Sequence, residues 1–534
     1  MRQLLFNGKI FVEKGRFCEA VYIEGERVKD VGSDDQLRQK YENQTEKVVD
    51  LQGATVIPGF NDSHLHLSYV GEGMAICNLI GTDSIDDLIQ RGRSYHKDRG
   101  QLPFILGRGW NQDFFLKGEN RLPHRKDLDR ISLDTPIVFD RVCGHVAVGN
   151  TKALEMAGIS VMTGIPGGTI GKDSRGQLNG IVTENAVTFL KRIIPRWKKE
   201  ERKEHLRLGA EYALSKGITS VQSADVSGPL FKEGFQWIHE AFQEKMIPLR
   251  YRHQFNFQDP EGFREYLKWE DQSAYREDYY ERGSLKIFKD GSLGGRTAFM
   301  KKPYRDDPGN YGVEAIEDEV LYSLVKMADQ AGIAAVVHGI GDGAVESILK
   351  IIETVDGGRG NPLRHGIVHN QITDEVQLKR IIQGKIAVLA QPVFIDYDWK
   401  IVEDRVGEDL AKTSYAFGTL YRNHALISFG TDAPVEDLDP FGNLYAAVTR
   451  KDKEGNPEEG YNSEEGLTME EAVDAYTYGS AVNEHKERVK GRLLPGYYAD
   501  FTVLDRDIFR VDAKEILETK VLNTVVGGKR VYGN

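Results

Sequence analysis

The chain has 534 residues, too many for one compact core of ordinary size, so we expect a large domain with an insertion or a companion domain. Its formal charge of −12, without any long basic run, argues against a nucleic-acid partner. No apolar run has the length of a membrane span or a signal peptide. Three cysteines, Cys18, Cys77 and Cys143, are scattered without C-x-x-C spacing. We therefore expect a cytoplasmic protein with no membrane partner, disulfide framework or zinc knuckle.

Both ends of the chain consist of short β-like runs separated by turns. The runs are 3–6, 9–12, 20–24, 27–31 and 47–51 near the N-terminus, and 498–504, 520–526 and 529–532 near the C-terminus. Each end is too short to fold well alone. We predict that residues 1–53 and 490–534 pair into one composite β-sandwich.

Residues 54–67 read as a buried strand that runs directly into His64 and His66. Side chains alternate along a strand, so this H-x-H pair directs both imidazoles to the same side, and two neutral imidazoles suit a divalent metal. Such a pair occurs by chance on a protein surface as often as it forms a pair of metal ligands. The metal interpretation therefore depends on further ligands at the ends of later strands.

Strand and helix patterns alternate through the rest of the chain. The further strand candidates are 218–222, 248–255, 285–288, 334–338, 365–369, 386–390 and 426–430. Helical patterns cover 317–330, 343–355 and 373–383, and Thr468 with Glu471 forms a capping box. Counting 54–67, eight strands alternate with helices, so we predict an α/β fold with a (β/α)8 TIM barrel over residues 54–489.

One interval between strands is too long for a simple crossover. Roughly 150 residues separate the first two strands, where a crossover needs only a few tens. The interval contains β-like runs of its own at 104–107 and 136–140. We predict that residues from about 70 to 205 form an inserted subdomain.

Polar residues recur at the predicted strand ends. They are His64, His66, Lys286, His338, His369 and Asp432. Each has an ordinary alternative, such as a hydrogen-bonded core histidine or an aspartate that caps a turn. Because the carboxyl ends of barrel strands meet in one bowl, their joint occurrence predicts a divalent metal site there.

Lys286 needs a separate argument, because a protonated lysine does not bind a cation. A lysine held neutral by burial could react with carbon dioxide to give a carbamate with two anionic oxygens. The alternative is an ion pair with Asp290. Alternation places Lys286 and Asp290 on one face of the strand and Lys289 on the other. The sequence leaves carbamylation open.

Five motifs lie at these strand ends: P-G-F-N-D-S-H-L-H at 58–66, K-I-F-K-D-G-S-L-G-G-R-T-A at 286–298, V-H-G-I-G-D at 337–342, I-V-H at 367–369 and G-T-D-A-P at 430–434. Together they resemble the amidohydrolase superfamily over essentially the whole chain. The long insertion and the K-x-F-x-D-G-S-L-G motif are similar to its amidohydrolase-3 branch, which includes N-substituted formamide deformylase-like enzymes. Gln222 to Asp225 and Asn370 depart from the usual pattern, which concerns substrate preference more than the metal site.

The resemblance implies a TIM barrel beside a composite β-sandwich, and hydrolysis of a carbon–nitrogen bond other than a peptide bond. It also implies a binuclear centre, with His64, His66 and Asp432 on one metal, His338 and His369 on the other, and carbamylated Lys286 between them. A divalent ion lowers the pKa of a bound water toward neutrality and so produces a hydroxide nucleophile. Asp432 is the expected catalytic acid and base, passing a proton to the leaving nitrogen, with a purely ligating role as the alternative. The nitrogen-rich ligands favour one or two zinc ions, with iron, manganese and nickel left open.

Other polar and aromatic residues are candidates for substrate contact. Arg141, His145 and Arg296 could hold a carbonyl or carboxylate, and Trp110 could line an apolar pocket. Ordinary ion pairing or packing explains each equally well. Asp290 and Asp342 could orient the metal ligands by hydrogen bonding to them, with turn formation as the alternative.

We conclude from the sequence that the chain is a metal-dependent amidohydrolase acting on a small amide, N-acyl or N-formyl compound. Two alternatives stay open: the same site used for deamination, isomerisation or ester hydrolysis, and a non-catalytic metal-binding barrel. The sequence also leaves open whether the chain forms a homo-oligomer.

Overall fold

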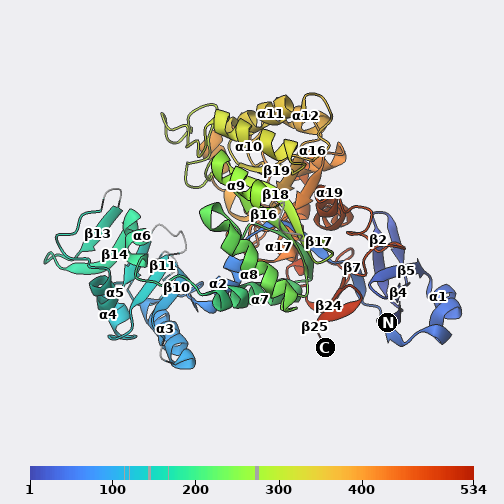
Figure 1. Cartoon of the computed structure of the whole chain (residues 1–534), viewed down its shortest axis with the longest axis horizontal. Helices are drawn as coiled ribbons and strands as arrows, with labels where there is room; N and C mark the ends of the chain where they lie inside the picture. Colours follow the sequence, from blue (N-terminus) through green and yellow to red (C-terminus); the bar gives the residue numbers. More distant parts are fainter. Residues whose placement is uncertain are drawn as a thin grey trace. The chain divides into compact units, whose positions relative to one another are not determined.

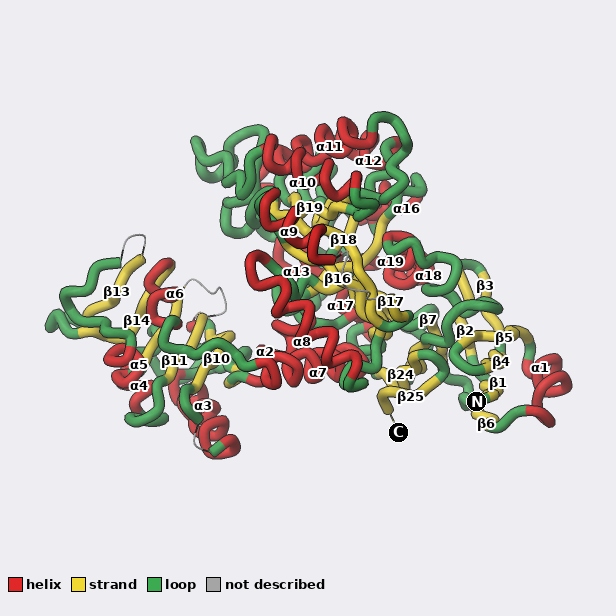
Figure 2. Tube along the Cα trace, in the orientation of Figure 1, coloured by secondary structure: helices red, strands yellow, loops and turns green. Residues whose placement is uncertain are grey.

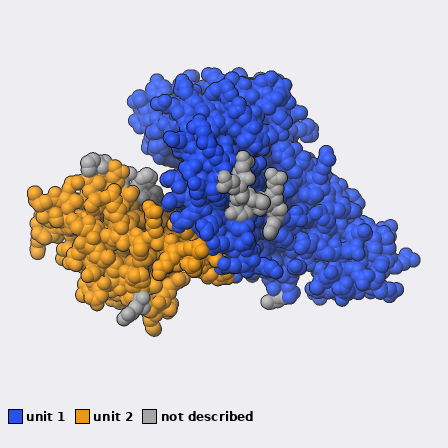
Figure 3. Space-filling model, in the orientation of Figure 1, with its two compact units in different colours: residues 1–69, 209–534 blue, residues 70–208 orange. Residues whose placement is uncertain are grey.

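The computed structural model describes residues 1–100, 102–112, 115–119, 121–141, 146–165, 168–270 and 276–533. It divides into two compact units, which Figure 3 shows in blue and orange: Met1–Tyr69 with Gly209–Asn534, and Val70–Leu208. Within the described ranges, every helix is too short or too polar to cross a membrane.

The centre of the first unit is a nearly closed sheet of parallel strands (Figure 1). Its eight parallel strands in the described chain are, in sheet order, β8 (Phe60–Leu65), β15 (Ile218–Ser223), β16 (Arg250–Asn256), β18 (Tyr280–Phe288), β19 (Ala335–Gly339), β20 (Gly366–His369), β21 (Ala387–Ala390) and β22 (Ile427–Phe429). A short strand, β17 (Arg276–Glu277), pairs antiparallel with β18. The predicted TIM-barrel fold is confirmed.

The first and last barrel strands are joined at their carboxyl ends. Asp432 N donates to His64 O over 2.8 Å, and His66 N donates to Ala433 O over 2.8 Å. The Asp62 carboxylate on β8 accepts hydrogen bonds from Thr431 N and Thr431 Oγ1. These contacts bring Asp432 beside the two histidines.

Helices follow the barrel strands, as Figure 2 shows for α8, α10 and α11. The main ones are α8 (Phe231–Gln243), α9 (Pro260–Glu270), α10 (Asp318–Gln330), α11 (Asp342–Asp356), α12 (Glu375–Gln383), α16 (Phe417–Arg422), α17 (Pro440–Thr449) and α18 (Met469–Asp474), whereas α7 (Lys199–Ser215) precedes β15. The predicted capping box is present, since Thr468 accepts from Glu471 N and Glu471 accepts from Thr468 N. These caps satisfy amides that the first turn of α18 leaves unpaired.

The prediction of one continuous strand over residues 54–67 is wrong. The stretch divides at Gly59 into β7 (Thr55–Pro58), which pairs with β2 (Lys9–Glu13) and β23 (Phe501–Leu504), and β8, which pairs with β15. A side chain at residue 59 would meet the Thr219 side chain at 2.2 Å, so the chain needs glycine where it passes from one sheet to the other.

Two further sheets of the first unit are built from the chain ends, the first from N-terminal strands alone and the second from strands of both ends. One has the order β5 (Arg27–Gly32), β4 (Ala20–Glu24), β1 (Arg2–Phe6), β6 (Lys47–Asp50), and the other β25 (Lys529–Gly533), β24 (Val521–Val526), β23 (Phe501–Leu504), β7, β2 (Lys9–Glu13), β3 (Arg16–Cys18). They share one apolar core, in which Leu5 and Ile23 of the first sheet pack with Val56 and Phe501 of the second. Neither chain end could cover this core alone.

The second unit, Val70–Leu208, has a sheet of its own. Its order is β13 (Gly168–Lys172), β14 (Leu178–Glu184), β12 (Val146–Gly149), β11 (Ile137–Arg141), β10 (Ile105–Trp110), β9 (Cys77–Asn78). Helices α3 (Ile85–Arg99), α4 (Arg125–Asp129), α5 (Thr151–Met156) and α6 (Asn185–Lys191) accompany the sheet. Ile105, Phe139 and Val148 are fully buried between these elements.

Candidate metal centre

Three of the predicted ligands meet where β8 and β22 end. His64 Nε2 lies 3.3 Å and His66 Nε2 lies 3.5 Å from Asp432 Oδ1. One ligand atom from each of the three residues lies within 4.8 Å of the others. Two imidazoles and a carboxylate at this spacing can hold a divalent cation.

The other three predicted residues adjoin this group. Lys286 Nζ lies 2.9 Å from His64 Nε2, and His338 Nδ1 lies 3.0 Å from His369 Nε2. The rings of His64 and His369 are 5.9 Å apart at their centroids. The structure thus brings all six residues into one cluster at the carboxyl ends of the barrel strands.

Two glutamine amides fix the orientation of His64 and His369. Gln254 Nε2 donates to Ser63 O, and Gln391 Nε2 donates to Leu389 O, so each amide oxygen is directed at an imidazole. Gln254 Oε1 lies 2.5 Å from His64 Nδ1, and Gln391 Oε1 lies 2.7 Å from His369 Nδ1. Because an amide oxygen only accepts, each Nδ1 carries the proton and each Nε2 is a bare acceptor.

Main-chain carbonyls fix the orientation of the other two imidazoles. His66 Nδ1 lies 3.0 Å from Ala224 O, and His338 Nε2 lies 2.9 Å from Gly291 O. Each of these nitrogens must donate, which leaves His66 Nε2 and His338 Nδ1 without a proton in the neutral ring. All four imidazoles therefore direct a lone pair into the cluster.

Apart from the Lys286 amine, which lies beside His64 Nε2, the inward atoms are acceptors, and some of them face one another. His338 Nδ1 and His369 Nε2 are 3.0 Å apart, and the Asp432 carboxylate lies opposite the bare nitrogens of His64 and His66. Acceptors at hydrogen-bond distance repel one another unless a cation or proton lies between them. The donor set therefore fits a divalent metal ion, with nitrogen ligands of the kind that zinc prefers.

Burial keeps most of the cluster in its metal-binding protonation state. It lowers the pKa of His64 and His338 well below the usual value, and that of His369 to about 4. Burial also lowers the pKa of Lys286 to about 7. Neutral imidazoles bind metal, and a neutral lysine amine is a nucleophile.

His66 and Asp432 behave differently because they interact with each other. Burial alone would lower the pKa of His66, but the adjacent Asp432 carboxylate, which accepts a hydrogen bond from Nε2 once the ring is protonated, raises it overall. Burial alone would raise the pKa of Asp432, but the contacts with His66 and the other imidazoles lower it overall. The Asp432 carboxylate is therefore ionised, as a metal ligand or proton acceptor must be.

Two of these residues have left-handed backbone conformations. His369 has φ +78° and Asp432 has φ +57°, in the region that favours glycine. Such conformations persist only where surrounding contacts impose them, and they concentrate at functional sites. Here main-chain hydrogen bonds hold both segments: Asn370 N, directly after His369, donates to Gly339 O, and Asp432 N donates to His64 O.

The two predicted orienting aspartates have different surroundings. Asp290 accepts from Phe299 N, Ile340 N and Gly341 N, and its Oδ1 lies 3.4 Å from His338 Nε2. Burial raises its pKa to about 7. It does not pair with Lys286, whose amine contacts His64 instead.

Asp342 begins helix α11 and accepts from Lys301 N. Its recorded contacts hold a neighbouring loop and include none of the six cluster residues. Turn and loop anchoring therefore accounts for Asp342 in this structure.

Of the predicted substrate residues, Arg296 belongs to the first unit, Arg141 and Trp110 belong to the second, and His145 lies outside the described chain. Arg296 pairs with Asp306 through Nε and NH2. In the second unit, Arg141 donates to Gln112 and Asn111. Trp110 has no exposed surface and donates its indole N–H to Phe139 O, so it packs in a core and lines no open pocket here. His145 falls outside the described residues.

Sequence reasoning missed the residues that orient the ligands. Gln254 lies within the predicted strand 248–255, and Gln391 directly follows 386–390. An amide side chain at the end of an apolar strand is the sequence feature that could have identified both glutamines. Asp62 was also missed, although it lies two residues before His64 and is fully buried.

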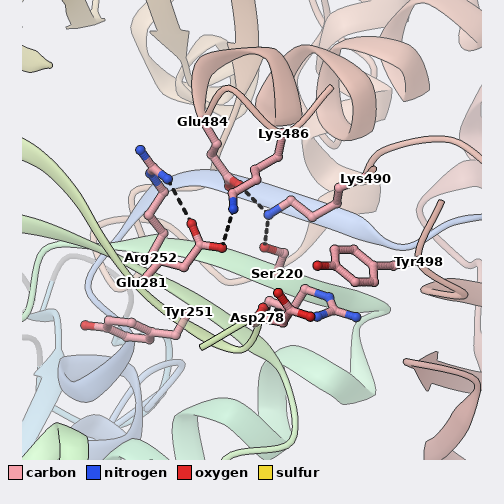
Figure 4. A pocket seen from close by; sticks show the side chains of 10 residues that line it. Ser220, Tyr251, Arg252, Asp278, Glu281, Glu484, Lys486, Lys490 and Tyr498 are labelled. Carbon is pink, nitrogen blue, oxygen red and sulfur yellow. Dashed lines mark hydrogen bonds and ion pairs between the residues drawn. The ribbon is translucent and has the colours of Figure 1, made fainter. Parts of the chain in front are cut away.

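A separate recess lies toward the amino-terminal ends of β15 and β16 (Figure 4). Its charged side chains pair with one another: Lys490 contacts Ser220 and Glu484, and Glu281 contacts Arg252 and Lys486. Because these groups satisfy one another, the recess belongs to the structural base of the barrel rather than to the metal cluster.

Comparisons with known proteins agree with this geometry. The model of the amidohydrolase family matches residues 47–532. The chain is 34% identical to "Putative amidohydrolase YtcJ" of Bacillus subtilis, over 100% of this chain and 99% of that one, and 24% identical to "N-substituted formamide deformylase" of Arthrobacter pascens, over 96% and 95%. A crystal structure of a metal-dependent hydrolase from Pyrococcus horikoshii has a TM-score of 0.79 and 30% identity, covering 96% of this chain and 99% of that one. The chain belongs to the amidohydrolase family.

Proposed function

We propose that the protein is a metal-dependent hydrolase that cleaves a carbon–nitrogen bond other than a peptide bond, in a small amide, N-acyl or N-formyl compound. The observation that carries the proposal is the set of four imidazoles that direct an unprotonated nitrogen of the neutral ring into one cluster with an ionised carboxylate. The formamide deformylase among its relatives supports the choice of bond. When bound, a divalent ion activates water and polarises a carbonyl oxygen.

The residues of the cluster have separate roles in holding the metal ions. His64, His66 and Asp432 would hold one ion, and His338 and His369 a second, with zinc as the expected metal. Lys286 is buried beside His64 with a lowered pKa, so its neutral amine can add to carbon dioxide, releasing one proton and forming a carbamate. That anion would add two oxygen ligands to the same cluster.

Asp432 is placed to move the proton that hydrolysis requires. Its carboxylate is ionised and lies against the nitrogens that face the ligand space. Oδ1 or Oδ2 can take a proton from the attacking water and give it to the leaving nitrogen, which would otherwise depart as an unstable anion. Proton transfer of this kind contributes about 10²- to 10⁴-fold to a rate.

The first test compares Asp432→Asn with the wild type on a panel of N-formyl and N-acyl amides, with esters and lactones included. We expect kcat to fall by about 10²- to 10⁴-fold, with metal retained through the histidines. Asp437→Asn, at an exposed carboxylate of the same loop, should leave the rate unchanged. Metal content and kcat are measured on each preparation.

Hydrolysis that persists in Asp432→Asn with metal retained would contradict the proton-transfer role. Turnover of esters or lactones but no amide would contradict the proposed bond. Full metal content without activity on any member of the panel would favour a non-catalytic barrel.

A further inference from the structure

His66 differs from His64 and His369 in the group that orients it. Glutamine side chains anchored to strands orient the other two rings, whereas the Ala224 carbonyl, in the loop after β15, orients His66. A loop carbonyl fixes a ring only if the loop itself is held. The contacts of residues 223–225 therefore decide how firmly His66 is placed.

Asp225 supplies most of the bonds that hold this loop. Its Oδ1 accepts from Ser68 N over 2.9 Å and from Ser68 Oγ over 2.7 Å. Its Oδ2 accepts from Ser223 Oγ over 2.6 Å and from Tyr251 OH over 2.8 Å. One carboxylate thus links the loop to α2 (Leu67–Ala75), to the end of β15 and to β16.

The bonds of this loop lie on both sides of His66 in the chain. Ala224 N donates to Leu65 O over 2.8 Å, and Leu67 N donates to Ser223 Oγ over 2.8 Å. Leu65, Leu67 and Ser68, on both sides of His66, are thus all hydrogen-bonded to residues 223–225. The Ala224 carbonyl is thereby held under His66 Nδ1, and Nε2 is left to face the cluster.

We propose that Asp225 is a positioning residue for the metal centre: through its four hydrogen bonds it fixes the Ala224 carbonyl that orients His66 for a divalent cation. The inference deepens the proposed function and rests on it. Asp225 itself makes no recorded contact with the six cluster residues. Groups that orient ligands in this way typically contribute 10- to 100-fold to metal affinity.

The test measures cobalt(II) affinity of the chelated, full-length protein by calorimetry and by the visible spectrum of the bound ion. We expect Asp225→Ala to bind the cobalt ion held by His66 about 10- to 100-fold less tightly than the wild type does. Asp225→Asn keeps one acceptor oxygen, so its loss should be intermediate, and it serves if the alanine variant folds poorly. Circular dichroism and thermal unfolding establish that each variant is folded.

The matched control is Asp356→Ala. Asp356 also accepts two bonds from its own loop, from Gly360 N and Asn361 N, but it lies before β20, at the opposite end of the strands from the cluster. This variant should lose stability and keep wild-type cobalt affinity. A general effect of removing a bonded aspartate would instead weaken both variants equally.

The decisive comparison repeats Asp225→Ala in a His66→Ala background. If Asp225 acts through His66, it should have no further effect on cobalt affinity there. Wild-type affinity in both Asp225 variants, or an undiminished loss in the His66→Ala background, would overturn the inference. Failure of the wild-type protein to bind cobalt would overturn the proposed metal site itself, and so is a distinct result.

Discussion

At the scale of single residues, the direction of each imidazole matters as much as its presence. The outward nitrogen of each ring meets an acceptor, Gln254, Gln391, Ala224 O or Gly291 O, so the inward nitrogen has no proton in the neutral ring. These acceptors select one tautomer before any ligand arrives. The candidate metal site is therefore organised by the hydrogen-bond partners of the imidazoles as well as by the imidazoles themselves.

Lys286 gives a prediction about pH. Burial lowers its pKa to about 7, so the amine is protonated below that pH and neutral above it, and only the neutral amine adds to carbon dioxide. At constant dissolved carbon dioxide, the activity regained by chelated protein with zinc should therefore rise as pH increases through about 7. Reconstitution rates across this pH range measure the effect.

Lys286→Ala is the control for this prediction. It should recover little activity at any pH, and carbon-13 NMR with labelled carbon dioxide should show a carbamate signal in the wild type alone. An identical pH profile in both proteins would contradict the assignment to Lys286.

The sequence could predict the ligands but not their partners. His64, His338 and His369 stand out because each ends an apolar strand, a signal within one segment. Gln254 meets His64 from a strand 190 residues away, and this pairing depends on barrel register. Arg296 and Trp110 have roles that depend on neighbours in three dimensions, an ion pair and a core, which local sequence does not specify.

At the scale of elements, the seam between β8 and β22 determines whether Asp432 reaches the histidines. Asp62 lies in this seam and accepts from Thr431 N, Thr431 Oγ1 and Tyr476 OH. Burial raises the pKa of Asp62 to about 7, so these donors stabilise a carboxylate in an unfavourable setting. The seam is thus linked directly to the metal centre.

Tyr476→Phe tests this linkage. Removing one donor from buried Asp62 should lower the free energy of unfolding by about 1–3 kcal/mol and also weaken metal binding, because Asp432 follows Thr431 directly. Urea denaturation and metal titration measure the two effects. Tyr421→Phe, which removes a similar bond to Asp474, should lower stability alone. Equal metal affinity in the two variants would contradict a role of the seam.

The sequence predicted the elements well where each carries its own signal. The helical pattern at 343–355 is α11, and the capping box at Thr468 starts α18. The division at Gly59 was missed because a single glycine separates two short strands, both of which are buried along their whole length. Only the pairing partners, β2 and β23 for β7 and β15 for β8, separate the two strands.

At the scale of the whole molecule, a buried ion pair joins the barrel to the sheet built from the chain ends. Arg250 on β16 donates to Asp500 through Nε over 2.6 Å and NH2 over 3.1 Å, and it lies 3.7 Å from the Tyr498 ring centroid. Asp500 also accepts from Gly527 N. Sequence patterns indicate sheets at both chain ends, but they do not show a contact of this kind.

Arg250→Met should therefore destabilise the first unit strongly. It leaves Asp500 buried with too few partners, at an expected cost of about 3–5 kcal/mol in the free energy of unfolding. Arg2→Met, which breaks an exposed pair with Glu46, should change it little. Urea denaturation followed by tryptophan fluorescence compares the variants, and equal stability would contradict the structural role of the buried pair.

The central claim is that the four inward-facing imidazoles and Asp432 bind divalent metal. The most direct measurement is the metal content per chain of protein purified without chelator, by plasma mass spectrometry, for the wild type and for His369→Ala. We expect one or two zinc or similar ions per wild-type chain and a clear reduction in the variant. A wild-type protein that contains no stoichiometric metal, and takes up none when zinc is added, would contradict the account.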